Sequence, residues 1–268
     1  MKTRIDKKFA ELKKAGRKGF IAYITAGDPS LDDTVEIALE LERAGADIVE
    51  LGIPFSDPLA DGPVNQAAAM RALAAGATLP RVLEIIRKIR EQSQIPLMCY
   101  TYTNPLAAPG FEKSVSELAT AGIDGLLILD LPVEESRGEL AILKKYNLNN
   151  IALVTPTSPD ERIRKIVKSA SGFVYIVSRE GVTGMQQQLS DGATALVERT
   201  KAHTKIPLAL GFGISSPETA RAAASAADGI VVGSAIVDRF WKAPHTPDGR
   251  REVGEWVATM VRAVKENS

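Results

Sequence analysis

The sequence predicts an α/β fold, a closed (β/α)8 TIM barrel. Eight short apolar runs rich in β-branched residues alternate with helical patterns, which is typical of parallel βα units. The chain has 268 residues, close to the roughly 250 typical of such barrels. No G-x-G-x-x-G motif follows the first run, which argues against an open dinucleotide-binding sheet. The expected strands are 20–25, 47–52, 96–101, 125–130, 151–155, 173–178, 207–211 and 229–233.

An extra helix is expected before the first strand, because Ile5, Phe9 and Leu12 recur at helical spacing and form one apolar stripe. Between the second and third strands, a proline-rich loop at 54–63 precedes two helical patterns, a helical insertion in the barrel. Three later helices are expected to start where a capping residue precedes proline: Asp28 with Pro29, Ser158 with Pro159, and Ser216 with Pro217.

The tail at 250–267 reads as a last amphipathic helix. No composition shift or flexible linker marks a boundary, so we expect residues 1–268 to form a single TIM-barrel domain.

Composition excludes several classes of function. Lys and Arg (33) balance Asp and Glu (33), so no positive field favours nucleic acid. No run approaches the roughly 20 apolar residues of a membrane span, and the N-terminus lacks the apolar core of a secretory signal. With a single cysteine, Cys99, the chain is expected to be cytoplasmic. His203 and His245 form no metal-binding pattern, so no metal is expected.

Glycine-rich segments follow the last strands, where TIM barrels commonly bind phosphate. The seventh strand is followed by G-F-G-I-S-S at 211–216, and the eighth ends in V-G-S-A at 232–235. Glycines let the backbone approach an anion, and a helix N-terminus directs its N–H groups at it. A third segment, G-V-T-G at 181–184, could cover the ligand. The alternative is that these glycines only make tight turns.

Carboxylates near the second strand are the candidate acid/base groups. Alternation places Ile48 and Glu50 on one face, so Glu50 is expected to point into the barrel mouth, where burial raises a carboxyl pKa. Asp57 and Asp61 follow in the loop. The alternatives are an ion pair for Glu50 and loop capping for the two aspartates. Tyr175 could equally be a core tyrosine.

The segment V-E-L-G-I-P-F-S-D-P-L-A-D-G-P at 49–63 closely resembles the signature of tryptophan synthase alpha chains. The resemblance covers nearly the whole chain, because further similar segments occur at 23–29, 104–105, 125–132, 175–184, 211–216 and 233–237.

The resemblance implies retro-aldol cleavage of indole-3-glycerol phosphate to indole and glyceraldehyde 3-phosphate. Glu50 would then be the general acid/base, and Asp61 would stabilise positive charge on the indole ring through its N–H. The phosphate-binding positions would be Gly184, Gly213, Gly233 and Ser234. The other pocket positions would be Tyr175, Phe212, Tyr23, Tyr100 and Thr183, with the Thr183 loop closing as a lid.

The resemblance also implies a partner, a beta chain that carries pyridoxal phosphate, in an alpha2-beta2 heterotetramer; no cofactor is expected in this chain. Asp57, Pro58, Asn104 and Pro105 match regions of that interface. The chain departs from the family where Tyr23 replaces the usual phenylalanine and Tyr100 an aliphatic residue, and where Val133 replaces a frequent proline.

Three alternative functions stay open. The chain could act alone as an indole-3-glycerol-phosphate lyase that releases free indole. It could be another phosphate-binding barrel, an isomerase or synthase, although that class does not predict the loop from Glu50 to Asp61. It could also be a catalytically idle subunit that regulates a partner enzyme, which the intact carboxylates oppose.

Overall fold

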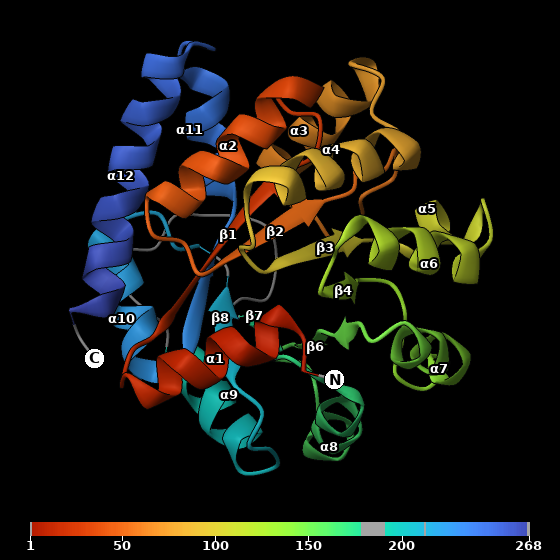
Figure 1. Ribbon diagram of the computed structural model, residues 1–268. Helices are drawn as coiled ribbons and strands as arrows, with labels where there is room; N and C mark the ends of the chain where they lie inside the picture. Colours follow the sequence, from red (N-terminus) through yellow and green to blue (C-terminus); the bar gives the residue numbers. More distant parts are fainter. Residues whose placement is uncertain (1, 178–190, 212, 267–268) are drawn as a thin grey trace.

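A computed structural model describes residues 2–177, 191–211 and 213–266. All strand pairs are parallel, in the order β5-β4-β3-β2-β1-β9-β8-β7-β6 (Figure 1). The strands are β1 (Gly19–Thr25), β2 (Ile48–Gly52), β3 (Leu97–Thr101), β4 (Gly125–Ile128), β5 (Asn149–Asn150), β6 (Ala152–Val154), β7 (Val174–Val177), β8 (Leu208–Gly211) and β9 (Gly229–Val232).

The two shortest strands, β5 and β6, are halves of one barrel strand. β5 pairs with β4, and β6 pairs with β7. Between them, the Ile151 N–H donates to the Leu126 carbonyl at 2.9 Å. This interrupted strand joins the two ends of the sheet, so the predicted eight-stranded barrel is confirmed, and each barrel strand overlaps one of the eight apolar runs.

The helices surround the sheet (Figure 1). They are α1 (Arg4–Lys14), α2 (Leu31–Arg43), α3 (Pro63–Ala74), α4 (Leu79–Gln92), α5 (Thr103–Ala107), α6 (Phe111–Ala121), α7 (Arg137–Lys145), α8 (Asp160–Ser169), α9 (Asp191–Lys201), α10 (Pro217–Ala226), α11 (Ser234–Lys242) and α12 (Pro247–Lys265). Both α3 and α4 lie between β2 and β3, which confirms the predicted insertion. No helix in the described ranges is long and apolar enough to cross a membrane.

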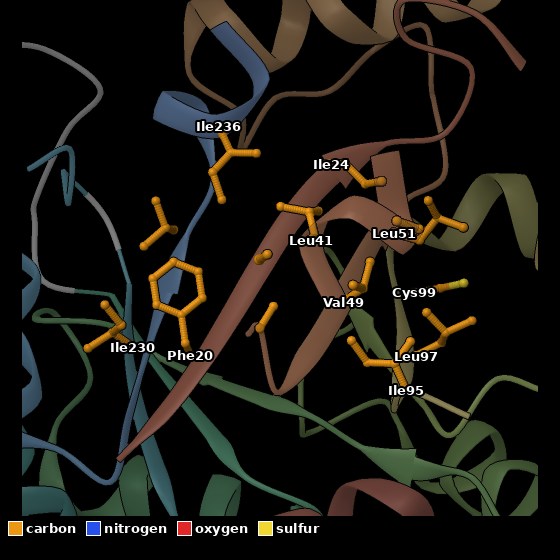
Figure 2. Packing of buried hydrophobic residues seen from close by; sticks show 14 of the residues in the cluster. Phe20, Ile24, Leu41, Val49, Leu51, Ile95, Leu97, Cys99, Ile230 and Ile236 are labelled. Atoms are coloured by element: carbon orange, nitrogen blue, oxygen red, sulfur yellow. The ribbon is translucent and has the colours of Figure 1, made fainter. Parts of the chain in front are cut away.

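The larger apolar core lies between the sheet and the helices. Strand residues that face outward pack there against helix residues such as Leu41 of α2 and Ile236 of α11 (Figure 2). Cys99 is part of this cluster and is fully buried, as expected for a small apolar residue. The alternate strand residues face inward and form a second core inside the barrel.

Helix α1 covers the amino-terminal end of this inner core. Its apolar stripe, Ile5, Phe9 and Leu12, is buried in the same cluster as the inward residues of the strands. The rings of Phe9 and Phe173 lie 5.5 Å apart. The predicted packing of the N-terminal helix is confirmed, and ligand access belongs to the opposite end.

One predicted helix start is confirmed and two are wrong. Ser216 caps α10, with proline at its first position. Helix α2 begins instead after Ser30, whose hydroxyl accepts from the Asp33 N–H. Asp28, before a cis Pro29, is unavailable because its carboxylate accepts two hydrogen bonds from Arg71, at 2.7 and 2.8 Å.

The second wrong start is at Ser158. Its hydroxyl lies 3.0 Å from that of Thr155, and α8 is capped by Pro159 with no side-chain hydrogen bond. The cap was therefore misplaced by one residue, because the serine instead stabilises the turn that precedes the helix.

Candidate active site at the carboxyl ends of the strands

A cavity of about 1090 Å³ opens at the carboxyl-terminal end of the barrel. Its lining brings together residues from β1, β2, β3, β7 and the segments after β2, β8 and β9. The sequence-predicted residues in this lining are Tyr23, Glu50, Asp61, Tyr100, Tyr175, Gly213, Gly233 and Ser234.

Glu50 is a buried carboxyl that has no hydrogen-bond partner among the residues that the structure describes. Its side chain lies on the inner face of β2, opposite Tyr23 of β1 and Met98 of β3 in the strand register. The residue is 1% exposed, and neither Oε1 nor Oε2 is hydrogen-bonded within the described chain. Burial, with a smaller contribution from the charge of Asp61, raises the pKa of Glu50 to about 8. Glu50 is therefore mostly protonated at neutral pH, and the ion-pair alternative has no support.

Asp61 is also buried, but its carboxylate is hydrogen-bonded. The Tyr100 hydroxyl donates to Oδ1 and the Tyr102 hydroxyl donates to Oδ2, each at 2.8 Å. Burial raises the pKa of Asp61, while the hydrogen bonds from Tyr102 and Tyr100 act in the opposite direction because they stabilise the ionised form. Helix α3 is capped by Gly62 without a side-chain bond, so Asp61 is not a helix cap.

Tyr102 is a site residue that the sequence analysis missed. Besides its bond to Asp61, its hydroxyl accepts from the Ala60 N–H at 3.0 Å and thereby holds the loop that follows β2. Its ring lies 5.3 Å from that of Phe55 in the same loop. The available signal was the spacing, because Tyr102 stands two residues after Tyr100 and continues the inward face of β3.

Three tyrosines, Tyr23, Tyr100 and Tyr175, form side walls of the cavity, and glycines in neighbouring strands leave space for two of them. The Tyr23 ring packs edge-on against that of Tyr100, with centroids 5.1 Å apart, and any side chain at Gly52 would collide with it. A Cβ atom at Gly211 would come within 2.5 Å of the Tyr175 hydroxyl oxygen. Gly211 thus has a packing role beyond the glycine-rich turn in which it was first noticed.

The expected phosphate end of the cavity is built from backbone. Gly213 has a φ of +77°, a conformation that favours glycine, and Gly233 is the N-cap of α11 without a side-chain cap. Ser234, the first residue of that helix, is exposed. Uncapped N–H groups at a helix N-terminus are suited to an anion. Thr183, Gly184 and Phe212 lie outside the described residues.

The expected interface residues lie on the outer rim. Asp57 and Asn104 are exposed, Pro58 and Pro105 are half-buried, and neighbouring Leu59 is 92% exposed. Asp130 is outside the cavity and accepts from the N–H and hydroxyl of Thr103 at the start of α5. Within the described ranges, no group of three or more His, Cys, Asp or Glu residues could hold a metal ion.

Comparisons with known proteins agree on one family. The family model described as tryptophan synthase alpha chain matches residues 9–266. A tryptophan synthase alpha chain from Caldanaerobacter subterraneus subsp. tengcongensis is 47% identical over 258 residues, which cover 96% of this chain and 98% of the relative. One from Geotalea daltonii is 45% identical over 262 residues, 98% of this chain and 97% of the relative.

Solved structures agree with the sequence relatives. The crystal structure of tryptophan synthase subunit alpha from Legionella pneumophila superposes with a TM-score of 0.90 at 36% identity, covering 98% of this chain and 99% of that one. The aminoacrylate-bound form of tryptophan synthase from M. tuberculosis gives 0.87 at 30% identity, covering 98% of this chain and 100% of the other.

Proposed function

Because this chain belongs to the tryptophan synthase alpha chain family, and is thus a lyase of tryptophan biosynthesis, we propose that it cleaves indole-3-glycerol phosphate to indole and glyceraldehyde 3-phosphate. The observation that carries the proposal is the pair of carboxyls in one cavity: Glu50 has no partner in the described part of the chain, and Asp61 is bound by tyrosines. Two such settings suit a proton donor and a fixed negative charge.

Glu50 is the general acid and then the general base. With a pKa of about 8, its carboxyl holds a proton at neutral pH and transfers it to C3 of the indole ring. The resulting carboxylate takes the proton of the neighbouring substrate hydroxyl. The O–H electrons form the aldehyde C=O, and those of the broken carbon–carbon bond return to the ring and restore indole. Glu50 ends the cycle protonated, as it began.

Asp61 stabilises the positive charge that forms on the indole ring in this reaction. Protonation at C3 makes the ring cationic, and its N–H becomes a stronger donor. An ionised carboxylate in a cavity of low dielectric stabilises that cation more than water would. Tyr23, Tyr100 and Tyr175 line the space that the ring would occupy.

The phosphate is assigned to the segments after β8 and β9. Gly213, Gly233 and Ser234 line the same cavity and supply backbone N–H groups, and Gly184 is expected to join them. Thr183 and Phe212 complete the proposed pocket, with the Thr183 loop as its lid.

A beta chain is the proposed partner, with two copies of each chain in the complex. Asp57 and Pro58 lie in the loop after β2, and Asn104 and Pro105 lie in α5. Tyr102, the N-cap of α5, connects the two segments through its contacts with Ala60 and Phe55. The exposed Leu59 between them offers an apolar contact. Pyridoxal phosphate is assigned to the beta chain, and none to this chain.

The test is indole release from indole-3-glycerol phosphate by the purified chain, alone and with the tryptophan synthase beta chain of a close relative. We expect release that rises when the beta chain is added. Strong release unaffected by it would instead favour a stand-alone lyase. No release in either case, with correct folding by circular dichroism, would overturn the proposed reaction and leave a phosphate-binding barrel or a regulatory subunit.

A further inference from the structure

The Tyr100 hydroxyl makes a single hydrogen bond in the described chain, to Asp61 Oδ1 at 2.8 Å. Tyr100 stands where the resemblance leads us to expect an aliphatic residue. Tyr102, by contrast, bonds both Asp61 and the Ala60 N–H, and so also holds the loop backbone. The two tyrosines therefore differ in what their hydroxyls do, although both reach the same carboxylate.

The two hydroxyls leave the carboxylate able to bind a ligand. A carboxylate has about four lone-pair positions, two on each oxygen, and the tyrosines occupy one on each. The remaining positions allow Asp61 to accept the indole N–H while both tyrosines stay bound. Bonds to both oxygens also fix the rotation of the carboxylate plane, which a single donor would leave free.

The other groups around Asp61 differ in their effect on its charge, and Arg239 and Lys242 of α11 line the same cavity without an ion pair to Asp61 in the described chain. Glu50 on β2 is a second carboxyl, and the Tyr23 and Tyr175 rings on β1 and β7 are apolar surfaces. On α3, the Asn65 amide favours the ionised form of Asp61. No Lys, Arg or His of the described chain forms an ion pair with Asp61, so hydroxyl and amide donors are its stabilising contacts in this part of the molecule.

We propose that Tyr100 is a positioning residue that keeps the Asp61 carboxylate ionised and oriented toward the indole N–H. Its ring is a pocket wall, but its hydroxyl acts on the substrate through Asp61. The inference rests on the proposed lyase function only for the identity of the ligand; the hydrogen bond and its effect on Asp61 are properties of the chain itself.

The test is Tyr100→Phe, which removes the hydroxyl and keeps the ring. Loss of a donor to the ionised carboxylate raises the pKa of Asp61, so the acidic limb of the kcat/KM profile should move to higher pH by about one unit. Activity on that limb should fall by roughly tenfold, mostly in kcat. Tyr23→Phe is the matched control: it removes the hydroxyl of the adjoining ring, which bonds Thr25 and not Asp61, so the acidic limb should stay in place.

A second measurement keeps the inference separate from the proposed reaction. Titration of the Asp61 carboxyl by carbon-13 NMR, assigned with Asp61→Asn, should show a higher pKa in Tyr100→Phe even if the wild-type chain releases no indole. An unchanged pKa in that variant would overturn the inference. So would a change in KM with an acidic limb that coincides with the wild-type limb, because that is the behaviour of a simple pocket wall.

Discussion

Carboxylates at the two ends of the barrel differ in their partners. At the amino-terminal end, Asp47, Asp124 and Asp228 each precede a strand and accept the N–H of a residue in a neighbouring strand, at 2.9 to 3.0 Å. Asp124 also pairs with Arg4 and Arg90, both at 3.0 Å. At the opposite end, both oxygens of Glu50 lack partners within the described chain.

This difference separates carboxylates that stabilise the fold from a carboxyl that can take part in the reaction. A buried carboxylate with donors and counter-charges stabilises the fold, whereas one without them is destabilising when ionised and so retains its proton. The amino-terminal end therefore holds the strands together, and the carboxyl-terminal end keeps a group that can give and take a proton. Substitutions at the two ends should separate these effects.

The largest expected effect is loss of turnover in Glu50→Gln. The amide keeps the shape of the side chain but has no titrating proton, so kcat should fall by at least ~100-fold, the low end for general acid/base catalysis. Substrate affinity, measured by calorimetry, should change little. A loss below tenfold would contradict the role of Glu50 and with it the comparison between the two ends.

The same variant should change how stability depends on pH. In the folded chain the pKa of Glu50 is about 8, above the ordinary glutamate value of 4.5 that applies when the chain unfolds. Between these values the folded state holds a proton that the unfolded state has released, so this contribution to stability is fully present below about pH 4.5 and is lost as pH rises to about 8.

Glutamine does not titrate and lacks this dependence. The free energy of unfolding of Glu50→Gln, relative to wild type, should therefore increase between about pH 5 and pH 8, by on the order of 3 kcal/mol. Urea unfolding at both pH values measures it. If the free energies of unfolding of the two proteins differed by the same amount at both pH values, Glu50 would titrate normally in the fold.

A smaller loss of stability is expected for Asp124→Asn at the other end. The amide oxygen can still accept the Leu97 N–H, but Arg4 and the largely buried Arg90 lose their counter-charge. The free energy of unfolding should fall by about 2 kcal/mol, with unchanged kcat per folded molecule.

Asp228→Asn is the matched control for that variant. Asp228 accepts the Leu208 N–H at 2.9 Å in the same way, but it is exposed and forms no ion pair in the described chain. Its replacement should cost much less stability. Equal losses in the two variants would assign the effect of Asp124 to the backbone bond rather than to its arginines.

Local patterns in the sequence were enough to predict the barrel and the inward direction of Glu50. The strands repeat an apolar pattern that needs no distant partner, and alternation alone directs Glu50 inward. The cap predicted at Ser158 was wrong for a local reason, because its hydroxyl contacts that of Thr155 in the preceding turn. At Asp28 a distant residue competes for the side chain: Arg71, far along the chain, binds Asp28 and excludes it from capping. Tyr102 was missed for the same reason, because its role depends on meeting the loop of Asp61.

Helix α1, which lies across the amino-terminal end, determines by which route small molecules reach the cavity. Because α1 fills that end with Ile5, Phe9 and Leu12, the route to Glu50 in the described structure runs through the opposite mouth, past the loop that carries Leu59. Molecules that enter the cavity and molecules that leave it then use the same passage. A protein bound over that loop would control how fast small molecules exchange with solvent, and could receive a product before it diffuses away.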